Sequence, residues 1–160
     1  MNYKTLTFIA LILSLTSFAQ NSKILVKSDE LIIPINTEFK IRAKENNGKI
    51  LNFELITESK ISRPIDMMSV LQKTEKKEII SNEIEFKFSK ADFMGSKLII
   101  LTTLQHFTKP IIFEAKIRLK GTEKYIETSI VPKGSNVFSV EQWNDDIDSI
   151  IISNLKFDEK

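Results

Sequence analysis

The only histidine, His106, lies in the segment LQHFTKP. An imidazole could act as a general base or as one ligand of a metal ion, but either role needs acidic, hydroxyl or further imidazole groups from elsewhere in the fold. One histidine without any cysteine does not make a zinc site. We therefore expect His106 to be a structural polar residue at the end of a strand, and we expect no metal site.

Other catalytic and cofactor motifs are missing from the sequence. No serine lies in a nucleophile elbow or in a Ser-x-x-Lys motif with its usual companions. The glycines at 48, 95, 121 and 134 are too scattered to form a phosphate-binding loop or a dinucleotide fingerprint. We therefore expect a protein that is not an enzyme, with no catalytic residue and no cofactor. A hydrolase whose carboxylates converge only after folding is the second alternative.

The segment WNDDID, residues 143–148, combines the only tryptophan with three carboxylates. Oxygen-rich loops can bind calcium, but this one lacks the glycine and the distal glutamate of an EF-hand, so a solvated turn before a strand is expected. Trp143 could stack its flat face on a sugar ring, or it could pack with the nearby apolar residues Val137, Phe138 and Val140. The packing role is favoured because a lone tryptophan is more often part of a core.

A second candidate surface consists of side chains expected to point outward from strands. These are Arg42, Lys44, Arg118 and Tyr125. The competing interpretation is ordinary solvation and the protection of sheet edges by charge. With Trp143, the residues Arg42, Arg118 and Tyr125 are the candidate binding residues of the chain.

These residues must be positioned by β-strands, because apolar residues alternate with period two throughout the chain after residue 20. The alternation predicts strands at residues 23–27, 31–35, 38–45, 49–57, 83–89, 97–105, 111–120, 123–131 and 149–157. Continuous apolar runs at 98–101 and 150–152 indicate strands covered on both faces. Residues 62–77 are compatible with a helical turn, a loop or an edge strand.

The first predicted hairpin turns at residues 46–48. Inward side chains on paired strands must lie opposite one another, and a three-residue loop places Phe39 opposite Leu55 and Ile41 opposite Phe53. A two-residue loop would instead place apolar side chains opposite polar ones. The three-residue loop, with Gly48 in the left-handed conformation, is therefore predicted.

The second predicted hairpin turns at Gly121 and Thr122 through a two-residue loop. This register places Ile117 opposite Ile126 inside, and it allows a cation–π contact between Arg118 and Tyr125 outside. It also pairs Phe113 with Ile130, Ala115 with Thr128 and Lys116 with Glu127.

Residues 89–95, with the sequence SKADFMG, lie between two predicted strands. They resemble the corner that carries the chain from one sheet of an immunoglobulin-like sandwich to the other. The resemblance lacks the Cys-Trp-Cys core of immunoglobulin domains, and it implies a fold without implying a function. The sequence thus predicts an all-β fold, a single immunoglobulin-like antiparallel β-sandwich of about 8–9 strands.

The N-terminus has the order of a secretory signal peptide. Lys4 precedes an apolar run from Leu6 to Leu15, and small side chains precede Gln20. The run has about 10 residues where a membrane span needs about 20, so cleavage after Ala19 is expected rather than an uncleaved anchor. Residues 1–19 are then the signal peptide and residues 20–160 form one domain, in which no segment is long enough to span a membrane.

Composition narrows the expected partners. The 23 basic and 21 acidic residues of the chain are interspersed, so no basic face for nucleic acid is expected. Without cysteine there is no disulfide framework and no acylated N-terminal cysteine for a lipid anchor. We therefore expect a secreted or periplasmic, non-enzymatic binding or accessory module whose partner is another protein of the bacterial envelope or surface. A secreted carbohydrate-binding domain is the alternative.

The expected cleavage site gives a direct test. The small residues Ser17 and Ala19 fit the subsites of a signal peptidase, so the exported protein should begin at Gln20. Intact-mass measurement of the protein recovered from the periplasm or the medium should give the mass of residues 20–160. A membrane-bound species that retains Met1 would contradict the prediction.

Overall fold

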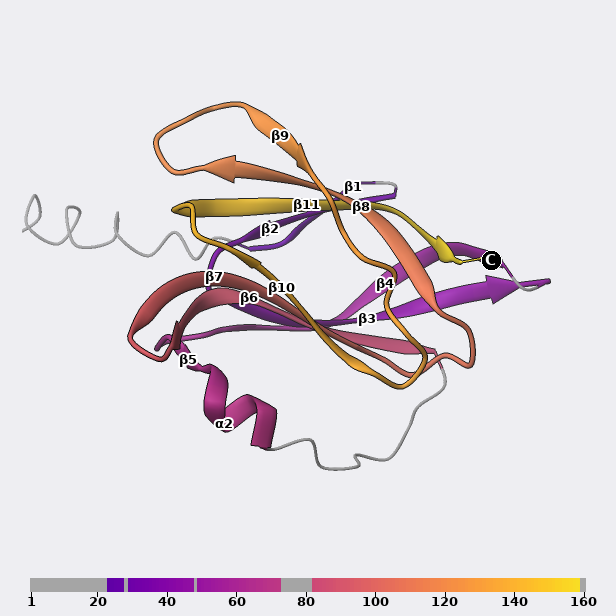
Figure 1. Cartoon of the computed structure of the whole chain (residues 1–160). Coiled ribbons are helices and arrows are strands. Elements are labelled where there is room, and N and C mark those ends of the chain that lie inside the picture. The colour runs from indigo at the N-terminus through magenta and orange to yellow at the C-terminus, as the bar shows by residue number, and fades with distance from the viewer. Residues whose placement is uncertain (1–22, 28, 48, 73–81, 159–160) are drawn as a thin grey trace, which may run out of the picture.

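The computed structural model describes residues 23–27, 29–47, 49–72 and 82–158. The signal peptide predicted at residues 1–19 and the predicted conformation of Gly48 lie outside the described residues. The described chain is all-β, and Figure 1 shows its strands in two layers. The expected all-β antiparallel architecture is confirmed.

Each layer is one sheet. Sheet A contains, in spatial order, β1 (Leu25–Lys27), β2 (Glu30–Pro34), β11 (Ile147–Phe157), β8 (Ile111–Leu119) and β9 (Tyr125–Thr128). Sheet B contains β10 (Phe138–Trp143), β7 (Ser96–Gln105), β6 (Glu83–Phe93), β3 (Thr37–Asn46) and β4 (Lys49–Lys60). The short strand β5 (Ile65–Asp66) pairs in parallel with β6 and leads into the helix α2 (Met67–Gln72).

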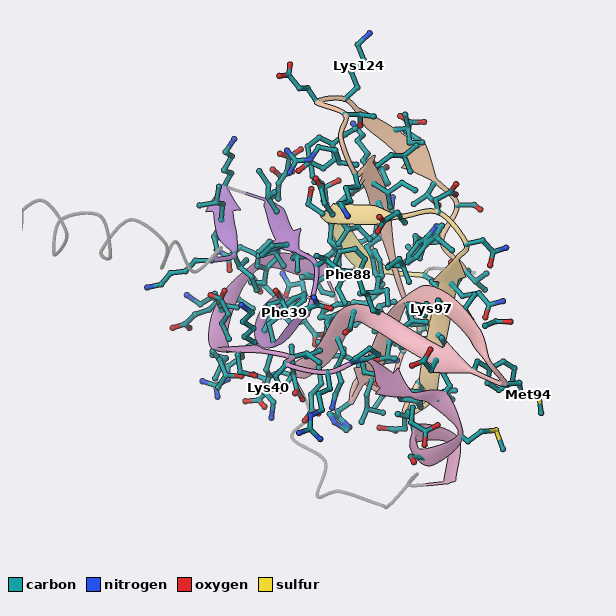
Figure 2. All side chains as sticks on the ribbon, turned by 90° about the vertical axis from the view of Figure 1, so that its left-hand side faces the viewer. Phe39, Lys40, Phe88, Met94, Lys97 and Lys124 are labelled. Atoms are coloured by element: carbon teal, nitrogen blue, oxygen red, sulfur yellow. The ribbon has the colours of Figure 1, made fainter. Side chains whose placement is uncertain are left out.

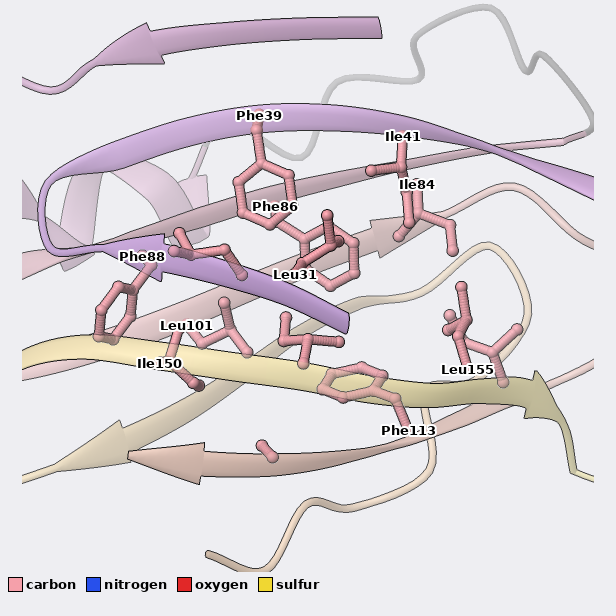
Figure 3. Close-up of a cluster of buried hydrophobic side chains, with 14 of the residues drawn as sticks. Leu31, Phe39, Ile41, Ile84, Phe86, Phe88, Leu101, Phe113, Ile150 and Leu155 are labelled. Atoms are coloured by element: carbon pink, nitrogen blue, oxygen red, sulfur yellow. The ribbon is translucent and has the colours of Figure 1, made fainter. Parts of the chain in front are cut away.

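The inner faces of the two sheets share one apolar core (Figure 3). Phe39 of β3 stacks on Phe86 of β6 at 4.9 Å between ring centroids, and Phe86 meets Phe113 of β8 edge-on at 5.9 Å. The last contact joins sheet B to sheet A. Burial of each such side chain stabilises the fold by about 1.5–3 kcal/mol, so a core of this kind can hold the sheets together without covalent cross-links.

The predicted strand positions agree broadly with the structure, except that β6 continues beyond Ser89 to Phe93 and that the chain differs around the last two crossings between the sheets. The strand expected at 123–131 is shorter, because β9 ends at Thr128. The strand β10 is absent from the prediction. It is an edge strand in which five of six residues are half-buried, so burial along it does not alternate sharply.

The apolar runs are correctly placed. β7 is buried almost throughout from Ile99 onward, and β11 lies in the middle of sheet A between β2 and β8. Residues 62–77, whose structure the sequence left open, contain β5 and α2 in their described part. No helix among the described residues is long and apolar enough to cross a membrane.

The corner predicted at residues 89–95 is wrong. β6 and β7 are neighbours within sheet B, with Phe93 opposite Ser96, so Met94 and Gly95 form a two-residue hairpin loop. Both have left-handed φ values, 49° and 84°, as a type I′ turn requires. In the described chain the crossings between sheets occur instead at residues 35–36, 106–110, 129–137 and 144–146.

The register predicted for the first hairpin is also wrong. Asn46 lies opposite Lys49, so the loop has two residues, and the ladder shifts twice along β4. The shifts are bulges, each with one extra residue on β4, and they bring Ile41 opposite Leu55 and Ala43 opposite Phe53. The bulges restore the apolar pairing that a regular two-residue hairpin would lose.

The register predicted for the second hairpin is confirmed over four pairs, from Ala115 opposite Thr128 to Arg118 opposite Tyr125. The pair of Phe113 with Ile130 does not form, because β9 ends first. The loop is also longer than two residues: the N–H of Thr122 donates to the Leu119 carbonyl at 3.1 Å, with Gly121 at a φ of 81°.

A buried ion pair closes the crossing between β9 and β10. Lys133 is only 2% exposed, and its Nζ donates to the carboxylate of Glu141 and lies 5.8 Å from the ring centroid of Phe113. The N–H of Val131 donates to the same carboxylate at 3.0 Å. Removing one member of such a pair leaves a buried charge without compensation, whereas replacing both by apolar residues is often close to neutral.

We predict that Glu141→Leu lowers the free energy of unfolding by about 3 kcal/mol. The double variant Lys133→Met with Glu141→Leu should lie within about 1 kcal/mol of the wild type, since no charge is then stranded. Urea denaturation of the three proteins measures both values. Equal losses in the single and double variants would show that the crossing does not depend on charge compensation.

Candidate functional site

A pocket of about 330 Å³ lies where the β6–β7 hairpin approaches the turn between β10 and β11. Residues 90–92 and 97–99 of the hairpin form one side, residues 144–146 of the turn form the other, and Pro64 before β5 completes the lining. Figure 1 shows that the hairpin and the turn lie at the same end of the two layers. The volume is at the lower end of the range for small-molecule sites.

The charged side chains of this pocket are largely unpaired. Asp146 contacts Lys120, with 3.3 Å between carboxylate oxygen and Nζ. By contrast, Lys90, Asp92, Lys97 and Asp145 make no side-chain ion pair or hydrogen bond with any other residue that the structure describes, although Asp92 and Lys97 are opposite one another in the β6–β7 ladder. The pocket end therefore presents two cations and two anions with no partner in the described chain.

Both walls of the pocket are held by neighbouring elements. On the hairpin side, the side-chain oxygen of Asn36 accepts hydrogen bonds from the hydroxyl of Ser89 at 3.2 Å and from the N–H of Lys90 at 3.4 Å. On the turn side, the Asp146 carbonyl accepts from the N–H of Lys120 and the Asp148 carbonyl from the N–H of Ile35, both at 2.8 Å. Both walls of the pocket are therefore fixed by hydrogen bonds within the described chain.

Trp143 is the last residue of β10 and does not line the pocket. It lies opposite Ile99 in the ladder, is half-buried against the main core, and its Nε1–H donates to the hydroxyl of Thr128 at 2.9 Å. This bond ties β10 of sheet B to β9 of sheet A. The geometry favours the packing role that the sequence suggested, in which Trp143 fixes the start of the turn at 144–146.

Arg118 and Tyr125 lie together on the outer face of sheet A. The guanidinium of Arg118 is 5.5 Å from the ring centroid of Tyr125, which confirms the expected cation–π contact. Its Nε donates to Asp148 at 2.8 Å, and this bond raises the pKa of Arg118 above its ordinary value. The Tyr125 hydroxyl bonds to Ser149 at 2.9 Å. The polar groups on this face therefore have their interaction partners within the protein.

Arg42 belongs to a different surface, the outer face of sheet B. It contacts Glu83 at 2.7 Å, and Lys40 beside it contacts Glu83 at 3.2 Å and Glu85 at 3.1 Å. Figure 2 shows Lys40 on this outer surface. The structure therefore does not bring Arg42 together with Arg118 and Tyr125. The opposite charges along β3 and β6 form a charge ladder, in which the role of Arg42 is to pair with Glu83 of β6.

His106 and the acidic segment do not form a metal centre in the described structure. His106 is buried, and its Nδ1 has no hydrogen-bond partner. Two of the carboxylates of residues 143–148 are paired with cations, Asp146 with Lys120 and Asp148 with Arg118, while Asp145 and Asp146 both line the pocket. Among the residues described, no three histidine, aspartate or glutamate side chains form a possible metal site.

The sequence identified only part of the pocket. The acidic turn at 144–146 stands out in the sequence as a cluster, but Lys90, Asp92 and Lys97 do not, because their segment resembles a corner between sheets. The signal that could have found them is the pair Met94-Gly95 between two strand-like runs. Two residues ending in glycine between such runs are typical of a two-residue hairpin loop.

Comparison of the chain with protein families, with curated proteins and with solved structures finds no match.

The charge ladder of sheet B makes stability depend on pH. The hydrogen bond from Arg42 lowers the pKa of Glu83, a residue only 3% exposed, below the ordinary value of 4.5. The ionised carboxylate therefore stabilises the fold fully above pH 4.5, and this contribution is lost as the pH falls through the lower pKa of the folded state.

We predict that Glu83→Gln lowers the free energy of unfolding by about 1–3 kcal/mol at pH 7, and that it flattens the loss of stability on acidification. Urea denaturation between pH 2 and pH 7 measures both effects. Glu38→Gln is the matched control, since the Glu38–Lys87 pair is exposed and should change stability by less than about 1 kcal/mol. Equal effects of the two substitutions would contradict the assignment.

Proposed function

We propose that this protein is an exported, non-enzymatic binding module with an immunoglobulin-like β-sandwich fold, which binds another protein of the bacterial envelope or cell surface through its pocket end. Two antiparallel sheets over a common core, with repeated crossings between them, support the sandwich. The N-terminal sequence supports export, with cleavage after Ala19.

The observation that carries the binding role is the set of charged side chains at the pocket. Lys90, Asp92, Lys97 and Asp145 have no partner among the described residues, yet the walls that carry them are fixed by hydrogen bonds. Such charges add little to the stability of the chain itself. They can select a partner whose charges complement them.

The mixture of positive and negative side chains at the pocket favours a protein as the partner. Protein surfaces carry interspersed positive and negative groups, and a polar rim of this kind surrounds most protein interfaces. The carbohydrate alternative depended on an outward aromatic platform, and the packing of Trp143 against the core gives it no support.

Affinity recovery from the native envelope tests the proposal. The mature protein, immobilised by a C-terminal tag, should recover a stoichiometric partner, and the charge reversals Lys97→Glu and Asp145→Lys should each reduce recovery about tenfold or more. Glu123→Lys, on the loop after β8, is the matched control and should recover the partner as the wild type does. Recovery of no defined chain, or recovery that ignores the pocket charges, would contradict the proposal.

A further inference from the structure

The tip of the β6–β7 hairpin carries the most exposed large apolar side chain of the described residues. Met94 is 81% exposed, and Figure 2 shows it at the outer end of the hairpin, pointing away from the body of the protein. The pocket lies along the same hairpin, since Asp92 and Lys97 line it. An apolar residue in this position contributes nothing to the core.

The backbone at Met94 is also unfavourable for methionine. Five described residues other than glycine have a left-handed φ, and four of them are asparagines: Asn36, Asn47, Asn136 and Asn154. Asparagine tolerates this conformation better than other residues with a side chain, and Asn-Gly is the preferred type I′ loop. Met94, with a φ of 49°, is the exception. Both exposure and backbone thus favour a polar residue here, and folding does not explain the methionine.

The hairpin that carries Met94 is supported close to its tip. A second, smaller core lies on the outer face of sheet B and consists of Met67 from α2 together with Ala91 and Ile100. Phe93 and Leu98 of the hairpin pack against it. Met94 is therefore presented on a fixed support. A side chain held in place before binding loses less entropy when it is buried by a partner.

We propose that Met94 is the anchor with which this protein enters an apolar socket on its protein partner, while the pocket charges form the surrounding polar rim. The inference rests on the proposed function and adds the binding element and the kind of surface that receives it. Methionine suits the role because its unbranched, polarisable side chain adapts to the shape of a socket. Interfaces commonly bury a few such anchors within a polar rim.

The charges beside Met94 favour a protein over a lipid surface. Lys90 and Lys97 are accompanied by Asp92 and Asp145, so this end carries as many negative as positive unpaired groups. Binding to an anionic membrane is driven by clusters of lysine and arginine. A balanced rim instead complements a protein surface of mixed charge.

The substitution Met94→Asn separates binding from folding. It should raise the melting temperature by about 1–4 °C, because asparagine relieves the left-handed backbone. It should lower the affinity for the partner identified by affinity recovery at least tenfold. Val131→Asn is the control: Val131 is 65% exposed, lies in the crossing after β9, and should leave the affinity unchanged.

Photo-crosslinking and vesicle flotation complete the test. A diazirine amino acid placed at position 94 should crosslink to apolar side chains in a concave site of that partner. Unchanged affinity of Met94→Asn, with the partner still recovered, would overturn this inference and leave the proposed function standing. Recovery of no partner by the wild type would overturn both. Flotation with phosphatidylglycerol–phosphatidylcholine vesicles that depends on Met94 would also overturn it, in favour of a lipid surface.

Discussion

The ring of Phe86 in sheet B contacts the ring of Phe113 in sheet A, with 5.9 Å between the ring centroids. The fold depends on the burial of apolar side chains between the two sheets, of which this contact is one example. Each sheet has an apolar inner face that is stable only when the other sheet covers it. The chain has no cysteine, so no disulfide can substitute for this burial. Once the sheets are stacked, the β6–β7 hairpin and the turn at residues 144–146 must lie at the same end. The pocket is therefore a consequence of the core.

Charged groups divide into two kinds in this structure. Those along β3 and β6 satisfy one another, as Arg42 and Glu83 do, and those on the outer face of sheet A do the same around Arg118. At the pocket end four charged residues, Lys90, Asp92, Lys97 and Asp145, have no such partners among the described residues, and the hairpin beside them exposes Met94. The features that stabilise the fold and those that remain available for binding thus lie on different surfaces.

The sequence predicted what depends on local alternation and missed what depends on insertions or on distant contacts. The register around Gly121 followed from the types of the opposed residues, and four of its pairs form. The register of β3 with β4 did not, because two bulges on β4 each add a residue that alternation does not reveal. Met94 and Gly95 were not recognised as a hairpin loop, because asparagine is the expected first residue. Half of the pocket was missed because its walls lie about 50 residues apart in the sequence and meet only after the sheets pack.

The facing of the two sheets can be measured directly through the only tryptophan, whose indole N–H gives a single resonance in an NMR spectrum. If β10 of sheet B closes against β9 of sheet A as described, this proton exchanges slowly with solvent and shows nuclear Overhauser contacts to the side chain of Thr128. Rapid exchange and the absence of contacts to Thr128 would contradict the packing of the two sheets on which the pocket depends.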